Sequence, residues 1–186
     1  MFKWLTFLLL LAIPATDLFS VGYDQPVPLS PVNEKKVTDL VSFVELLFNT
    51  VGGQGASRQE KEIIISETYL KAFSGDQAKI EDDLHKREVI INKDIQNYLR
   101  DVDIFFKNVE FNFDIKEIQQ LQNASGQTYF KAKVLRTLNG TTFNTEAVQN
   151  QLERFIEINL DAERGDLKIA SIYNVESNNR LTLQQW

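Results

Sequence analysis

The chain has 186 residues, of which 43% are hydrophobic and 25% are charged, and its formal net charge is -6. This composition is typical of a globular domain with its own core, and it argues against disorder. The acidic balance argues against a nucleic-acid binder. The absence of cysteine excludes disulfides, thiolate metal sites and a lipoprotein anchor.

The N-terminus has the pattern of a secretory signal peptide. Lys3 precedes an apolar run over 4–15 that only Thr6 and Pro14 interrupt. The run is shorter than the roughly 20 residues of a membrane-spanning helix. We therefore predict a signal peptide over 1–22 and export to the periplasm, the cell surface or the medium, with no stable membrane span after cleavage. The alternative is a chain tethered by this segment left uncleaved.

Residues 23–31 are rich in proline and predict an extended linker. A first helix is expected to begin at Ser30-Pro31 and to end at Gly52-Gly53, because apolar residues recur at three- and four-residue steps between them. Ser57 and Glu60 form a capping-box pattern. It predicts a second helix to about Phe73, although the β-branched run 63–65 would also suit a strand.

Residues 76–91 are less regular, and 79–81 and 89–91 are candidates for short strands. Asn92 is expected to cap a third helix through Tyr98 and Phe106. Four segments then alternate apolar and polar residues, as strands with one buried face do: 109–115, 128–135, 155–160 and 167–173. A phase shift at Glu117-Ile118 suggests a bulge, 123–127 a turn, and Asn139-Gly140 a tight hairpin.

This order predicts an α+β fold, with N-terminal helices packed on one face of a strongly curved antiparallel sheet, like half of a barrel. Residues 154–159 and 167–173 resemble the closing strands of the nuclear transport factor 2-like superfamily, a cone-shaped fold that includes ketosteroid isomerase and polyketide cyclases. Leu167 replaces the Trp usual there. Residues 69–84, with Tyr98-Leu99 and 103–106, resemble more narrowly the uncharacterised exported domains of Bacteroidetes-type bacteria. The resemblance covers 32–175, and in that group a tail like 176–186 leads into a further module.

Few residues suggest catalysis. His85 is the only histidine, which excludes a His-clustered zinc or two-His iron site. It could pair with Asp82 or Asp83, but a solvated loop histidine is the favoured interpretation. The acidic run 81–83 lacks the alternating spacing of a calcium loop, and a solvated turn is favoured there. No catalytic, cofactor or metal residues are therefore predicted, and Asp103 is expected to face solvent.

The superfamily resemblance implies that the interior of the cone is where a ligand would bind. The residues expected between sheet and helices are pocket candidates if the cone is open and core if it is filled, and core is favoured for the aromatic ones. The candidates are Tyr98, Asp103, Phe106, Phe111, Phe113 and Phe130. Lys131, Lys133, Arg136 and Arg154 are expected on the wet face of the sheet.

These observations favour an exported, non-catalytic binding or interaction module without a cofactor, whose partner is an unknown protein or small ligand. One alternative is a small-molecule carrier or an isomerase- or cyclase-like enzyme that uses the cone interior. A second alternative is a structural domain that forms homodimers through the sheet. Fold alone does not decide among them.

Overall fold

The computed structural model describes residues 24–84, 89–161 and 165–174. The predicted signal peptide (1–22), His85 and the tail (176–186) lie outside the described residues. Within the described ranges, no helix has the length and apolar character that a membrane crossing requires.

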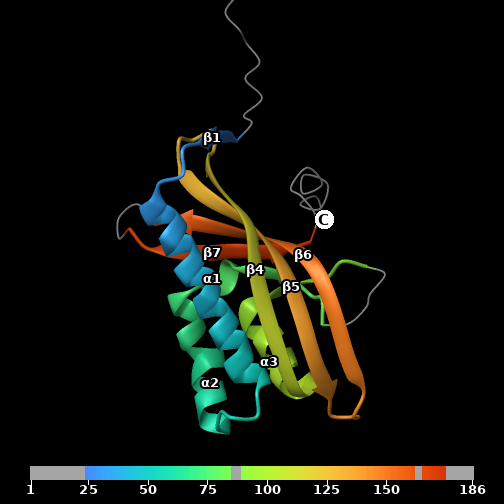
Figure 1. Cartoon of the computed structure of the whole chain (residues 1–186). Coiled ribbons are helices and arrows are strands. Elements are labelled where there is room, and N and C mark those ends of the chain that lie inside the picture. Colours follow the sequence, from blue (N-terminus) through green and yellow to red (C-terminus); the bar gives the residue numbers. More distant parts are fainter. Residues whose placement is uncertain (1–23, 85–88, 162–164, 175–186) are drawn as a thin grey trace, which may run out of the picture.

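The fold is α+β, as predicted, with three α-helices on one side of a curved, seven-stranded sheet (Figure 1). The strand order is β1-β4-β5-β6-β7-β2-β3. The pairings are antiparallel except that β2 (Lys79–Glu81) runs parallel to β7 (Leu167–Tyr173), which makes the sheet mixed. Buried apolar residues of the helices and of the inward sheet face form one core, which includes Val41, Phe48, Val102, Phe111 and Ile156.

Helix α1 (Pro31–Gly52) has the predicted bounds. Ser30 caps it by accepting a hydrogen bond from the backbone N–H of Asn33, and Val37, Val44 and Phe48 are among the residues on its buried face. The helix also covers part of the edge of β4 (Phe106–Gln122). There the side chain of Asn49 accepts a hydrogen bond from the N–H of Phe111 and donates one to its carbonyl oxygen, at 2.6 and 2.8 Å. The amide of Asn49 thus replaces a neighbouring strand.

Helix α2 (Arg58–Ser66) begins with the predicted capping box between Ser57 and Glu60. The predicted extension to Phe73 is wrong. The chain leaves the helix at Glu67 and forms a short 3-10 turn, η1 (Thr68–Lys71). The reason is tertiary, because Phe73 forms a parallel bridge with Ile169 of β7, and the backbone must be extended there to do so.

The segment that follows places two more short strands at the sheet edge. After the 3-10 turn η2 (Gly75–Gln77), β2 forms at the predicted position. The strand predicted over 89–91 lies instead at Asn92–Asp94 (β3), paired with β2. Asp94, rather than Asn92, therefore caps α3 (Ile95–Phe105), and its carboxylate accepts a hydrogen bond from the N–H of Asn97 at 2.8 Å.

The central strands are longer than predicted. After β1 (Gln25–Val27), β4 is followed by β5 (Thr128–Thr142) and β6 (Ala147–Leu160). The predicted bulge is confirmed, because Ile115 pairs with Val134 and Glu117 with Lys133, which leaves Lys116 as the extra residue.

The hairpin predicted at Asn139-Gly140 is wrong. Both residues lie inside β5, and the turn follows Thr142, where Thr145 has a φ of 64°. Gly140 pairs with Val109 of β4 and Val148 of β6. A Cβ atom at position 140 would lie 2.9 Å from the carbonyl oxygen of Asn108, so close strand packing explains this glycine better than a turn does.

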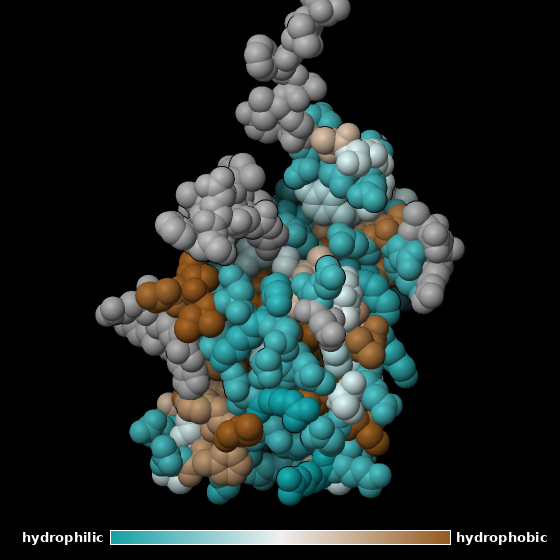
Figure 2. Space-filling view, turned by 180° about the vertical axis from the view of Figure 1, so that it is seen from behind, coloured by the Kyte–Doolittle hydropathy of each residue, from teal (hydrophilic) through white to brown (hydrophobic). Residues whose placement is uncertain are grey.

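The surface seen from behind is mostly hydrophilic, with separate hydrophobic areas (Figure 2). Apolar side chains with more than half of their surface exposed are few among the described residues, and they are Val32, Leu46, Val89, Ile104 and Phe143.

Replacing Gly140 with Ala should lower the free energy of unfolding by about 1–3 kcal/mol, because the added methyl group must displace the backbone of Asn108 or the side chain of Val109. Gly55→Ala is the matched control, because no atom lies within 4 Å of the added Cβ there. Urea unfolding monitored by circular dichroism measures both. Equal stability of the two variants would show that Gly140 is not required for close packing.

Candidate functional site

Two arginines that were predicted on the solvent-exposed face of the sheet lie inside the fold instead. Arg136 on β5 and Arg154 on β6 are each 1% exposed. Arg154 pairs with Val134 and Arg136 pairs with Leu152. Paired residues of neighbouring strands point to the same face of a sheet, so both arginines point toward the core, as Val134 does. The prediction was wrong because it followed side-chain type. The period-2 pattern places Arg136 with Val134 and Arg154 with Ile156, on the core side.

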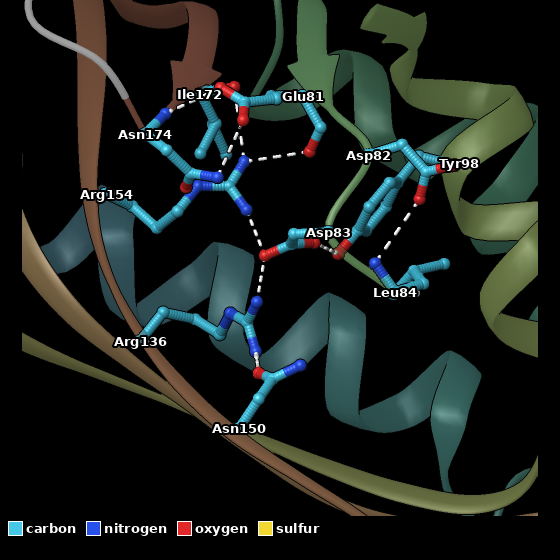
Figure 3. Close-up of polar contacts among 10 residues, drawn as sticks. All are labelled: Glu81, Asp82, Asp83, Leu84, Tyr98, Arg136, Asn150, Arg154, Ile172 and Asn174. Carbon is cyan, nitrogen blue, oxygen red and sulfur yellow. Dashed lines mark hydrogen bonds and ion pairs between the residues drawn. The ribbon is translucent and has the colours of Figure 1, made fainter. Parts of the chain in front are cut away.

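Asp83 lies between the two guanidinium groups (Figure 3). Its Oδ2 atom accepts hydrogen bonds from Nη2 of Arg136 and Nη1 of Arg154. Its Oδ1 atom accepts a hydrogen bond from the Tyr98 hydroxyl of α3 at 2.8 Å. Both oxygens of one buried carboxylate are therefore bound by donors from β5, β6 and α3, and we call Asp83, Arg136, Arg154 and Tyr98 the arginine cluster.

The arginine cluster connects four strands. Arg136 also donates to Asn150 of β6, and Nη2 of Arg154 donates to the carbonyl oxygens of Glu81 (3.0 Å) and Ile172 (3.3 Å). The Glu81 carboxylate accepts hydrogen bonds from the backbone and side-chain nitrogens of Asn174, at 2.8 and 2.7 Å. These contacts join β2 and the end of β7 to the central strands.

The acidic run 81–83 is buried, and the solvated turn predicted for it is wrong. The three carboxylates face different partners, since Glu81 binds Asn174, Asp83 binds the arginines, and Asp82 lies 2.8 Å from the ammonium group of Lys93. Lys93 also pairs with Asp101. The carboxylates are thus held apart by separate partners and do not converge on one point, as ligands of a cation would.

Charge fixes the protonation of this cluster. Burial alone would raise the pKa of Asp83, but the charges of Arg154 and Arg136 and the hydrogen bond from Tyr98 outweigh it and hold the pKa below its ordinary value. Burial, together with the charge of Asp83, raises the pKa of the Tyr98 hydroxyl well above its ordinary value. At neutral pH the cluster therefore contains an ionised carboxylate, two cations and a neutral phenol.

The predicted pocket residues separate into three groups. Tyr98 belongs to the arginine cluster. The Phe111 and Phe113 rings pack against the Phe48 ring, with centroids 5.3 and 5.9 Å from its centroid. Phe106, Phe111 and Phe130 are buried, and Phe113 is half-buried. Asp103 lies outside this interior, 3.0 Å from the ammonium group of Lys61, with 36% of its side chain exposed.

Sequence reasoning missed both arginines and Asp83. The alternation of inward and outward residues along the two strands could have shown that the arginines point toward the core. No local pattern places Asp83 between them.

A hollow lies on the surface, where α1 ends and α2 begins. It has a volume of about 380 Å³ and is lined by Asn49, Thr50, Gly53, Gly55, Ala56 and Glu60. The Glu60 carboxylate is already engaged by the N–H of Ser57. The hollow therefore offers mainly backbone groups and small side chains.

No family model matches the sequence, and no curated protein matches it. Among solved structures, Aln2 from a Streptomyces species has a TM-score of 0.50 at 9% identity, over 84% of this chain and 99% of that one. A structure of naphthalene 1,2-dioxygenase with indole bound in the active site has a TM-score of 0.47 at 10% identity, over 78% of this chain and 79% of that one. The likeness to Aln2 concerns the fold alone, and it fits the predicted nuclear transport factor 2-like cone.

Arg154→Met should lower the free energy of unfolding by about 1–3 kcal/mol, because it removes one of the two cations on Asp83 and leaves the buried carbonyl oxygens of Glu81 and Ile172 without this donor, while Arg136 still pairs with Asp83. Lys133→Met on the neighbouring strand is the matched control. It removes a surface ion pair with Glu153, which contributes about 0–1 kcal/mol. Chemical denaturation at pH 7 compares them, and a similar small loss in both variants would contradict the buried pairing.

The contribution of Asp83 to the free energy of unfolding should depend on pH. Because its pKa is lowered in the folded state, the stabilisation is present above the unfolded pKa of about 3.9 and is lost as the pH falls through the folded pKa. Wild type should therefore be more stable than Asp83→Asn at pH 7, and the difference should shrink steadily below about pH 4. Urea unfolding between pH 7 and pH 2.5 measures this, and a difference independent of pH would refute it.

Proposed function

We propose that this chain is an exported, non-catalytic binding module. The observation that carries this proposal is the state of Asp83, the carboxylate buried between β5, β6 and α3. A general base needs a pKa near the working pH and an oxygen free to accept a proton. Asp83 has a lowered pKa, and both of its oxygens already accept hydrogen bonds. The described interior is therefore suited to holding charge in place, and poorly suited to moving protons.

The chemistry of the arginines supports binding. A guanidinium stays charged at any physiological pH and presents a planar fork of donors that matches a carboxylate. In the interior, the guanidinium groups of Arg136 and Arg154 lie on adjacent strands and donate to the same oxygen of Asp83. This is the arrangement of a recognition site for an anion, in which geometry and fixed charge supply the selectivity.

Export is proposed from the sequence. Lys3 and the apolar run over 4–15 have the order of a signal peptide, and the resemblance to exported domains of Bacteroidetes-type bacteria agrees with it. By that resemblance the module would precede another module in a longer envelope or secreted protein.

The protonation of Asp83 tests the non-catalytic proposal. Carbon-13 NMR of labelled aspartate, with the Asp83 carboxyl signal assigned by its loss in Asp83→Asn, should show no titration of this group between pH 5 and pH 8. A midpoint for Asp83 between pH 6 and pH 7 would contradict the proposal and favour an enzyme that uses the cone interior.

The export proposal predicts that residues 1–22 direct a reporter out of the bacterial cytoplasm. Fused to an alkaline phosphatase that lacks its own signal, they should give active, exported enzyme. Leu9→Arg, which interrupts the apolar run, should leave the reporter inside the cell. Equal export with both sequences, or with neither, would reject the signal peptide.

A further inference from the structure

We propose that the Arg136–Arg154 pair is a receptor site for a carboxylate ligand, and that Asp83 is its exchangeable internal occupant. The inference rests on the proposed binding function and names the ligand class. In the structure, the side-chain carboxylate of Asp83 stands in for the ligand, bound by Arg136, Arg154 and Tyr98 (Figure 3).

Each of the two arginines has a hydrogen-bond donor that is not used. Among the described residues, the Nε atoms of Arg136 and Arg154 are buried and have no hydrogen-bond acceptor. Both guanidinium groups bind the same oxygen of Asp83, so neither forms the two-bond fork with it that arginine and carboxylate favour. A buried donor without an acceptor costs stability. A ligand carboxylate that is not tethered to the backbone could turn to accept more of these hydrogen bonds.

The receptor and the occupant are held differently. Arg136 and Arg154 lie on β5 and β6, which are paired with each other along almost their whole length. Asp83 lies between the short strands β2 and β3, in a stretch with neither helical nor strand structure at positions 82 and 83. Removing Asp83 from the site therefore requires this connection to shift, while the strands that carry the arginines keep their pairing.

Three donors define the chemical class of the ligand. The two guanidinium groups reach one oxygen of the carboxylate, and the Tyr98 hydroxyl reaches the other. The geometry fits a planar group with two oxygens. A small monocarboxylate such as acetate reproduces the aspartate side chain beyond its Cα atom.

Tethering makes Asp83 a strong competitor, because an internal group acts at a high effective concentration. The variant Asp83→Ala should therefore bind acetate at least tenfold more tightly than wild type does. The thermal unfolding midpoint of Asp83→Ala should rise with acetate in a saturable manner, relative to chloride at the same ionic strength. The double variant Asp83→Ala/Arg154→Met should show no such rise.

If Asp83→Ala does not fold in chloride, acetate should restore cooperative unfolding to it and not to the double variant. Acetate and chloride acting equally on Asp83→Ala, or acetate acting equally on both variants, would overturn the carboxylate site.

The wild-type chain tests whether the occupant exchanges. Acetate at high concentration should accelerate hydrogen exchange of the Leu84 N–H, which donates to Asp82 beside the occupant, while chloride should not. Unchanged exchange at acetate concentrations a hundredfold above those that saturate Asp83→Ala would show that Asp83 is permanent, and would overturn its role as an exchangeable occupant.

The two proposals can fail separately. A neutral-range titration of Asp83 removes the non-catalytic function whatever acetate does. A failure of acetate to bind, with Asp83 ionised throughout, removes only the ligand assignment.

Discussion

The carboxylate of Asp83 and the guanidinium groups of Arg136 and Arg154 interact in the interior of the sheet, where each charge would be costly alone. A buried pair of this kind adds little net stability compared with an apolar core, but losing one partner is expensive. The interaction therefore acts as a constraint. It requires the connection after β2 to lie against the inward face of the curved sheet, and it requires two central strands to direct cations inward at neighbouring positions.

That constraint selects the register of the sheet. A one-residue slip of β6 would turn Arg154 outward and Phe155 inward, exchanging the faces of the whole strand. In the observed register, Phe155 lies on the outer face, where its ring stacks on Tyr173 at 5.8 Å. The packing of Gly140 against β4 and the bulge at Lys116 act on a different pairing, that of β4 with β5. Buried charge and local packing thus each restrict the register of one pair of central strands.

Much of the fold follows from local patterns in the sequence. The caps at Ser30 and Ser57, the helix stop at Gly52-Gly53 and the alternating strands are decided by nearby residues. The structure has the caps and the helix stop where they were predicted, and its strands include all four predicted segments, three of them within longer strands. The end of α2 was mispredicted because it depends on the bridge from Phe73 to Ile169, which lies far along the chain. The in-strand position of Gly140 likewise depends on neighbouring strands, although Asn-Gly is a common turn pair.

The candidate site was harder to predict than the fold. Charged side chains are mostly exposed, and this tendency outweighed the strand parity that places Arg136 and Arg154 inside. Once the arginines are placed inward they require an acidic partner, yet the sequence offers three adjacent carboxylates at 81–83 without distinguishing them. Tertiary contacts assign each one a separate partner. The site forms only in the assembled fold, because its residues lie far apart in the sequence. No contiguous motif therefore predicts it.

The central claim is that Asp83 and Arg154 act as one buried unit, and a double-mutant cycle tests it most directly. The free energies of unfolding of wild type, Asp83→Asn, Arg154→Met and the double variant give the coupling between the two side chains. Our account predicts a coupling of at least about 2 kcal/mol at pH 7, as expected for groups within one buried network. Single-variant losses that add to within about 0.5 kcal/mol would mean that the two residues are independent, and would contradict the account.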